Sequence, residues 1–185
     1  MKPVRTGSIQ DRKIAIYDGL LKQNEVVALD RAFQNAPFTK NEVAKAETQN
    51  SPHWALNLSI EEFKSTPMYS NLLLALSDFT GDASNYHPYR HYCNYASFGD
   101  MLYSHRDSSE PGAEITALWF ICTKWHHDWG GETLFYSDEG DAEFVCTPKP
   151  GRLVLFDSHL LHAGKAPNRN CLQPRFTFAV KLEKA

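Results

Sequence analysis

The chain has 185 residues, with 22 acidic and 19 basic side chains and a formal net charge of −3. This length suits one domain whose hydrophobic core is large enough to fold without disulfides or metals as staples. Hydrophobic residues make up 42% of the chain, which excludes a disordered protein. The chain has no basic block, so we expect no nucleic-acid partner and no membrane-surface partner.

The N-terminus and the cysteines indicate a compartment. The first residues, MKPVRTGSIQDRK, contain no apolar run, so we expect a soluble, cytoplasmic protein. The cysteines are Cys93, Cys122, Cys146 and Cys171. None forms a C-x-x-C pair, and a cytoplasmic location disfavours disulfides. We therefore expect four reduced, buried thiols.

The N-terminal third carries helix signals. In residues 24–38, Val26, Leu29 and Phe33 recur at helical spacing, and a proline closes the segment. Residues 59–63 (SIEEF) begin with a capping-box pattern. Residues 66–81 (TPMYSNLLLALSDFTG) start with a threonine and a proline and stop at a glycine. These segments predict helices that pack outside a core.

From about residue 88 the sequence changes to short β-like runs with turn residues between them. The expected strands are RHYCNYA, MLYSH, ITALWFIC, ETLFY, EFVCT, RLVLF and RFTFAVKL, which turn residues separate. Such spacing predicts a sandwich, barrel or jelly roll. The predicted fold is therefore mainly β with N-terminal helices (α+β), in one domain of residues 1–185. Residues 1–87 would form a helical support with a possible lid, and residues 88–185 the core.

Polar side chains in this β region suggest a metal site. His105 and Asp107 lie two positions apart in SHRD, a spacing that puts both on one face of a strand. A later histidine, His159 or His162, would complete two imidazoles and one carboxylate. That set is the facial triad of non-haem Fe(II) oxygenases. Further on, Arg175 offers a planar fork for the carboxylate of a small acid.

With these motifs in order, the chain resembles the 2-oxoglutarate- and Fe(II)-dependent dioxygenases, in their prolyl-4-hydroxylase-like branch. The resemblance runs from about Arg90 to Leu182. It rests on HRD, then WGGETLFY, then PKPGRLVLFDSHLLHAGKAP, then RFT. It implies a double-stranded β-helix (jelly roll, cupin-like) core. The N-terminal helices match this family only loosely, as the helices that usually support such a core.

The resemblance assigns roles to residues. His105, Asp107 and His162 would be the iron ligands, since the family pattern favours His162 over His159. Arg175 would bind the distal carboxylate of 2-oxoglutarate. The remaining co-substrate contacts would come from Thr177, as a hydroxyl partner, and Tyr95. One departure is Phe120, which stands where some prolyl hydroxylases have a second co-substrate tyrosine.

The implied cofactors are Fe(II), 2-oxoglutarate and O2, with ascorbate as an optional addition. The implied reaction hydroxylates an unactivated C–H bond and releases succinate and CO2. Asp107 favours hydroxylation, because halogenating relatives have glycine or alanine at that position. Desaturation and cyclisation by the same chemistry remain open. The substrate would be a small molecule, an amino acid or a peptidyl side chain, and the sequence does not fix the oligomeric state.

Other interpretations stand beside this one. A cupin-like protein that binds a metal or a small molecule without turnover could have a similar core, but would not need Arg175. An inactive scaffold would usually have lost a ligand or the arginine. His126 and His127 precede a Gly-Gly turn, so we expect them to be exposed loop residues. Residues 46–57, which include His53 and Trp54, could form a lid or pack on the core.

Overall fold

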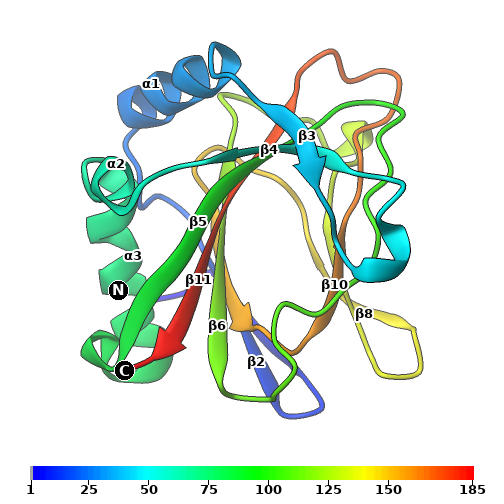
Figure 1. Cartoon of the computed structure of the whole chain (residues 1–185). Coiled ribbons are helices and arrows are strands. Elements are labelled where there is room, and N and C mark those ends of the chain that lie inside the picture. Colours follow the sequence, from blue (N-terminus) through cyan, green and yellow to red (C-terminus); the bar gives the residue numbers. More distant parts are fainter. Residues whose placement is uncertain (1) are drawn as a thin grey trace.

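The structure is a computed structural model that describes residues 2–185. Two β-sheets face each other, and helices cover the outer face of the larger one (Figure 1). The helices are α1 (Gln23–Gln34), α2 (Ile60–Lys64) and α3 (Pro67–Thr80), with single-turn 3-10 helices η1 (Ala46–Thr48), η2 (Ala83–Asn85) and η3 (His127–Trp129). The strands are β1 (Arg5–Ile9), β2 (Arg12–Tyr17), β3 (Thr39–Glu42), β4 (His53–Asn57), β5 (Tyr86–Ala96), β6 (Glu114–Ile121), β7 (Thr133–Tyr136), β8 (Ala142–Cys146), β9 (Leu153–Asp157), β10 (Leu161–Gly164) and β11 (Arg175–Lys184).

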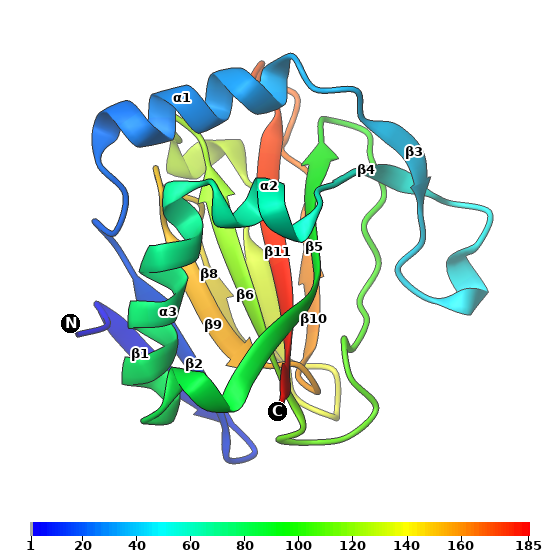
Figure 2. The same ribbon diagram turned by 60° about the vertical axis from the view of Figure 1, so that its left-hand side comes forward.

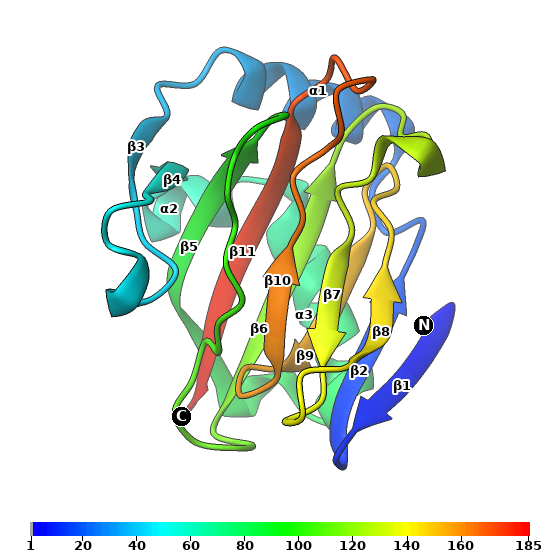
Figure 3. The ribbon, with the colours of Figure 1, turned by 90° about the vertical axis from the view of Figure 1, so that its right-hand side faces the viewer.

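The larger sheet has eight strands in the order β1-β2-β9-β6-β11-β5-β4-β3, and the smaller sheet has the order β10-β7-β8. All pairs of neighbouring strands are antiparallel. Figure 2 shows α1, α2 and α3 in front of the larger sheet, and Figure 3 shows the smaller sheet on its other side. This arrangement confirms the predicted mainly β, jelly-roll fold with helices outside the core.

Strand alternation divides the core into two layers. On β11, Phe176 and Phe178 point to the helical layer and pack with Phe33 of α1. The intervening residues point into the space between the sheets. On that face lie Arg175, Thr177, Ala179 and Lys181, all of which line one pocket. The last strand thus supplies apolar packing on one face and a row of polar groups on the other.

The three predicted helices form where the sequence signals place them. The capping box of α2 closes with two hydrogen bonds, Ser59 N to Glu62 Oε2 at 2.6 Å and Glu62 N to Ser59 Oγ at 3.2 Å. Helix α3 has Pro67 at its first position and ends at Gly81, whose φ of 89° is the left-handed conformation that glycine tolerates. These caps set the helices against the larger sheet.

The structure corrects three expectations about elements. The N-terminal third contains four strands besides the helices, and β1–β4 extend both ends of the larger sheet. The run MLYSH is not a strand, because its one pairing is an isolated bridge at His105. Strand β10 was not predicted, since four residues after a turn carry too short a pattern.

The cysteines are free thiols and are all buried, as predicted. Within residues 2–185, no helix combines the length and the apolar composition needed to cross a membrane.

A partly buried ion pair joins the N-terminal part of the chain to the core. Arg152 donates to both carboxylate oxygens of Asp18 at 2.7 Å and to the carbonyl of Thr147 at 2.9 Å. The hydrogen bond from Arg152 holds the pKa of Asp18 below its ordinary value. The carboxylate therefore stabilises the fold most when it is ionised.

We predict that Arg152→Ala lowers the free energy of unfolding by about 2 kcal/mol at pH 7, because it leaves a partly buried carboxylate without its partner. The pair's contribution should be complete above the unfolded pKa of about 3.9 and be lost as the pH falls below it. Urea denaturation at pH 7 and near pH 3 measures this, with exposed Arg169→Ala as the control. An equal loss at both pH values would show that the ion pair is not its source.

Candidate active site

Three predicted ligands meet in the space between the sheets. The ligand atoms of His105, Asp107 and His162 all lie within 4.8 Å of one another. The Nε2 atom of His105 is 3.3 Å from Oδ1 of Asp107, and Nε2 of His162 is 3.5 Å from Oδ2. Asp107 and His162 are nearly fully buried, and His105 is the most exposed of the three.

Backbone pairing holds the three residues together. His105 and His162 form an isolated antiparallel bridge, with two N–H to carbonyl hydrogen bonds of 3.0 Å. The backbone N–H of Asp107 donates to the carbonyl of Ser158 at 2.8 Å. The segment before β6 is therefore hydrogen-bonded to the turn before β10. These bonds bring the three ligands together although His105 does not lie in a regular strand.

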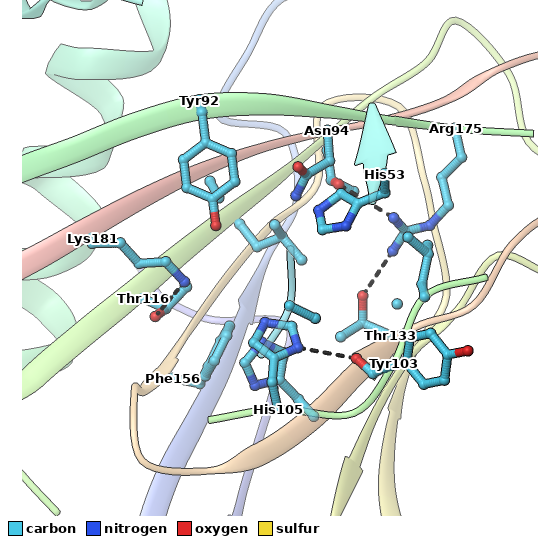
Figure 4. A pocket seen from close by; sticks show the side chains of 17 residues that line it. His53, Tyr92, Asn94, Tyr103, His105, Thr116, Thr133, Phe156, Arg175 and Lys181 are labelled. Atoms are coloured by element: carbon cyan, nitrogen blue, oxygen red, sulfur yellow. Dashed lines mark hydrogen bonds between the residues drawn. The ribbon is translucent and has the colours of Figure 1, made fainter. Parts of the chain in front are cut away.

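Both imidazoles are oriented for metal binding. The Nδ1 atoms of His105 and His162 lie 3.0 Å and 2.9 Å from the carbonyls of Tyr103 and Leu160 (Figure 4 shows the first of these bonds). A carbonyl only accepts, so each Nδ1 must carry the proton and each Nε2 has a free lone pair. Burial also lowers the pKa of His162 to about 4, which keeps its ring neutral. This donor set fits a divalent iron.

Asp107 has two further partners that sequence reasoning missed. Its Oδ2 accepts a hydrogen bond of 2.7 Å from Thr116 Oγ1 and forms an ion pair with the ammonium of Lys181. Burial would raise the pKa of Asp107, but Lys181, His162 and His105 together outweigh it and hold that pKa well below its usual range. Burial would likewise lower the pKa of Lys181, and Asp107 together with Tyr92 more than offsets this. The carboxylate is thus kept ionised deep in the fold.

Arg175 lies in the same pocket as the triad and is fully buried. Its Nε donates to the carbonyl of Gly131 at 2.6 Å, and its terminal nitrogens donate to Thr177 Oγ1 at 3.2 Å and Thr133 Oγ1 at 2.9 Å. A guanidinium has about five N–H groups, so about two remain. In the described part of the chain no carboxylate forms an ion pair with Arg175. Burial lowers its pKa to about 10, so it is still a cation at neutral pH.

Two glycines make room for this guanidinium. A Cβ on Gly164 would lie 3.1–3.3 Å from the end of the Arg175 side chain, and one on Gly131 would clash with Trp125 at 2.8 Å. The ring of Phe120 lies 5.4 Å from the guanidinium carbon. Phe120 therefore lies next to Arg175 and contacts it with an aromatic ring that has no hydroxyl group.

The structure contradicts the predicted role of Tyr95. Strand register pairs Tyr95 with Phe176 and Asn94 with Thr177. Tyr95 accordingly faces away from the pocket and packs on Phe38, Trp54 and Phe176. The residues of β5 that line the pocket are instead Tyr92 and Asn94. Thr177 lines the pocket beside Arg175, and its role as a hydroxyl partner of the co-substrate stays a prediction.

The other histidines do not belong to the triad. The ring of His159 turns away from the triad, and its Nδ1 lies 3.0 Å from the carbonyl of Ser108. His126 and His127 are exposed, as predicted. In the segment from residue 46 to 57, His53 lines the pocket on β4. Residues His53–Asn57 form strand β4 of the larger sheet and are not a free lid.

Comparison with known proteins agrees with this site. The sequence profile of the 2OG-Fe(II) oxygenase superfamily matches residues 90–180, which contain the triad and Arg175. The chain belongs to this superfamily and is an Fe(II)/2-oxoglutarate-dependent dioxygenase. The superfamily uses Fe(II), 2-oxoglutarate and O2. A search of curated proteins finds no match.

Solved structures share the fold at low identity. A prolyl hydroxylase from Trichoplax adhaerens, in complex with a peptide of hypoxia inducible factor, is 19% identical, with a TM-score of 0.66 over 92% of this chain and 83% of that one. A Pseudomonas putida prolyl-4-hydroxylase is 14% identical, with a TM-score of 0.67 over 93% and 92%. EvdO2 from Micromonospora carbonacea var. aurantiaca, complexed with 2-oxoglutarate, is 15% identical, with a TM-score of 0.70 over 100% and 94%.

Proposed function

We propose that this chain hydroxylates an unactivated C–H bond of a small molecule, amino acid or peptidyl side chain, with release of succinate and CO2. One observation carries the proposal. A buried arginine that forms no ion pair with a carboxylate of residues 2–185 lies in the same pocket as a two-histidine, one-carboxylate triad. A buried cation of this kind requires an anion, and 2-oxoglutarate has a carboxylate to offer it.

In this proposal each residue has one role. His105 and His162 bind Fe(II) through Nε2, and Asp107 binds it through a carboxylate oxygen. Arg175 and Thr177 bind the distal carboxylate of the co-substrate. When bound, Fe(II) and 2-oxoglutarate supply, with O2, the oxidative decarboxylation that places a hydroxyl on the substrate.

The protein's own contribution is geometry and exclusion of water. The apolar side chains of Leu118 and Phe156 line the pocket between the triad and the sheet. They come from β6 and β9, whose backbones are hydrogen-bonded along their length, so the walls are rigid. Rigid walls keep the reacting groups in one arrangement, and the apolar side chains on them limit contact with water.

The alternative is a cupin-like protein that binds a metal or small molecule without turnover. Such a protein needs the triad but has no use for a buried guanidinium beside it. Arg175 costs free energy to bury and makes no ion pair within residues 2–185, which favours the oxygenase.

Two measurements test the proposal. Air-free protein with Fe(II) should show the metal-to-ligand absorbance of a 2-oxoglutarate complex, and in air it should release succinate in the presence of a pooled metabolite and peptide library. His162→Ala should abolish both signals by removing one of three ligands. His159→Ala should keep both, because its ring faces Ser108. Metal binding that survives His162→Ala and is lost in His159→Ala would contradict the ligand assignment.

A further inference from the structure

A second cavity adjoins the triad on the side away from Arg175. Its volume is about 210 Å³, and its lining is mostly polar. It shares His53, Tyr92, Asn94, His105 and Lys181 with the pocket described above, so the two spaces meet at the metal ligands. A substrate placed here would lie next to the iron without occupying the space beside Arg175.

Lys181 lines this cavity. Figure 4 shows Lys181 and Arg175 on opposite sides of the pocket, both extending from β11. The Lys181 ammonium contacts Asp107 and lies 3.4 Å from Thr116 Oγ1. Asp107 is the only carboxylate in ion-pair contact with it among residues 2–185. Lys181 is therefore paired with the residue whose charge the metal would take.

A second cation lies directly across from it. Arg90 of β5 is the register partner of Lys181 on β11, and it too lines the cavity. Like charges directly opposite each other on neighbouring strands destabilise a sheet unless counter-charges offset them. Here Arg90 pairs with Glu42 at 2.7 Å, on the cavity wall, as Lys181 pairs with Asp107.

Metal binding disturbs this balance. Three cations line the cavity of the metal-free chain, and each has a carboxylate partner: Lys181 pairs with Asp107, Arg90 with Glu42 and Arg106 with Asp138. A divalent ion on Asp107 takes over that carboxylate's charge, and Lys181 becomes a buried ammonium with too little counter-charge. A buried ammonium is costly without an anion, so the metal-loaded site should attract one.

We propose that the substrate is a free amino acid, whose carboxylate binds Lys181 and Arg90 and whose ammonium binds Glu42. This inference rests on the proposed function and names the substrate class of the same site. Both ends of a zwitterion then find a partner on the cavity wall. A residue inside a peptide has neither charge, so it would leave Lys181 of the metal-loaded site without an added anion.

The size of the cavity agrees with this class. A cavity of about 150 Å³ holds benzene. A space of about 210 Å³ therefore suits a molecule somewhat larger than benzene, which is the size of one amino acid. The ring of Tyr92 lies under the Arg90 guanidinium, at 4.3 Å, and fixes its position.

The test uses air-free protein saturated with Fe(II) and 2-oxoglutarate, and monitors the absorbance of that complex. The standard L-amino acids are added singly, each beside its α-amide and its N-acetyl amide. At least one amino acid should shift the absorbance and, in air, raise succinate release. Its amide and its peptide-like N-acetyl amide should bind roughly 10- to 100-fold more weakly, because they lack the carboxylate.

Variants locate the binding groups. Arg90→Gln should weaken binding of that amino acid roughly tenfold or more and leave the 2-oxoglutarate absorbance intact, since Arg90 contacts no metal ligand. Lys181→Gln should also weaken binding of that amino acid, and Lys181→Arg should retain most of the affinity by keeping the cation. The 2-oxoglutarate absorbance of both variants is measured first, because Lys181 pairs with the ligand Asp107. The exposed Arg169→Gln is the matched control. If Lys181→Gln fails to load Fe(II), Arg90→Gln decides alone.

The outcomes are separable. If no amino acid shifts the absorbance, if an amide binds as tightly as its acid, or if Arg90→Gln binds like wild type, the amino-acid proposal is wrong. If wild-type protein never forms the 2-oxoglutarate complex, the proposed function itself fails, which is a different result.

Discussion

Asp107→Ala is expected to abolish iron binding and, in the same variant, to lower the stability of the metal-free fold. Two imidazoles alone make a poor site for Fe(II), so the 2-oxoglutarate absorbance and succinate release should both vanish. The stability loss has a separate cause. Lys181 would remain as a buried ammonium without its carboxylate, which typically costs about 3–5 kcal/mol.

A second substitution separates these two effects. In Asp107→Ala/Lys181→Met, an apolar side chain of similar length replaces the stranded ammonium. We expect about 2 kcal/mol or more of the lost stability to return, while iron binding stays absent. Urea denaturation in the presence of a chelator measures this, with the exposed Asp138→Ala as the control. A double variant no more stable than Asp107→Ala would show that the pair with Lys181 is not what stabilises the apo fold.

The parts of the fold that the sequence predicts well are those with a long, regular pattern. The long β-like runs ITALWFIC and RFTFAVKL place β6 and β11 correctly, and cap residues such as Ser59 and Gly81 place the helix ends. Short edge strands were missed. Edge strand β3 (TKNE) is entirely polar, because an edge of the sheet near solvent does not need an apolar stripe. Its neighbour β4 (HWALN) has only five residues, too few for a clear pattern.

The triad could be predicted because its members occur in an ordered set of motifs, but Tyr95 shows the limit of spacing alone. One residue of register decides which face of a strand a side chain occupies, and only pairing with Phe176 shows that Tyr95 faces the helices. Lys181 had a readable signal. It follows Arg175 by an even number of positions on one strand, so both must share a face.

The second large effect concerns Arg175. Arg175→Ala is expected to weaken 2-oxoglutarate binding at least about 100-fold, because two charge-assisted hydrogen bonds of roughly 1.5–3 kcal/mol each would be lost. Arg175→Lys keeps the charge but loses the planar fork and the bonds to Gly131 and Thr133, so its affinity should fall between the two. Iron binding should survive both changes. Titration of the air-free Fe(II) protein, followed by the absorbance of the complex, measures the affinities.

The co-substrate itself supplies the matched control for Arg175. 2-Oxopentanoate has the chain length of 2-oxoglutarate but lacks the distal carboxylate. If Arg175 binds that carboxylate, wild type and Arg175→Ala should bind 2-oxopentanoate with nearly equal, weak affinity, and the large difference should appear only with 2-oxoglutarate. The competing possibility is that Arg175 only braces the loop at Gly131 and the smaller sheet at Thr133. In that case the substitution would weaken both ligands alike, because a displaced loop does not distinguish a carboxylate from a methyl group.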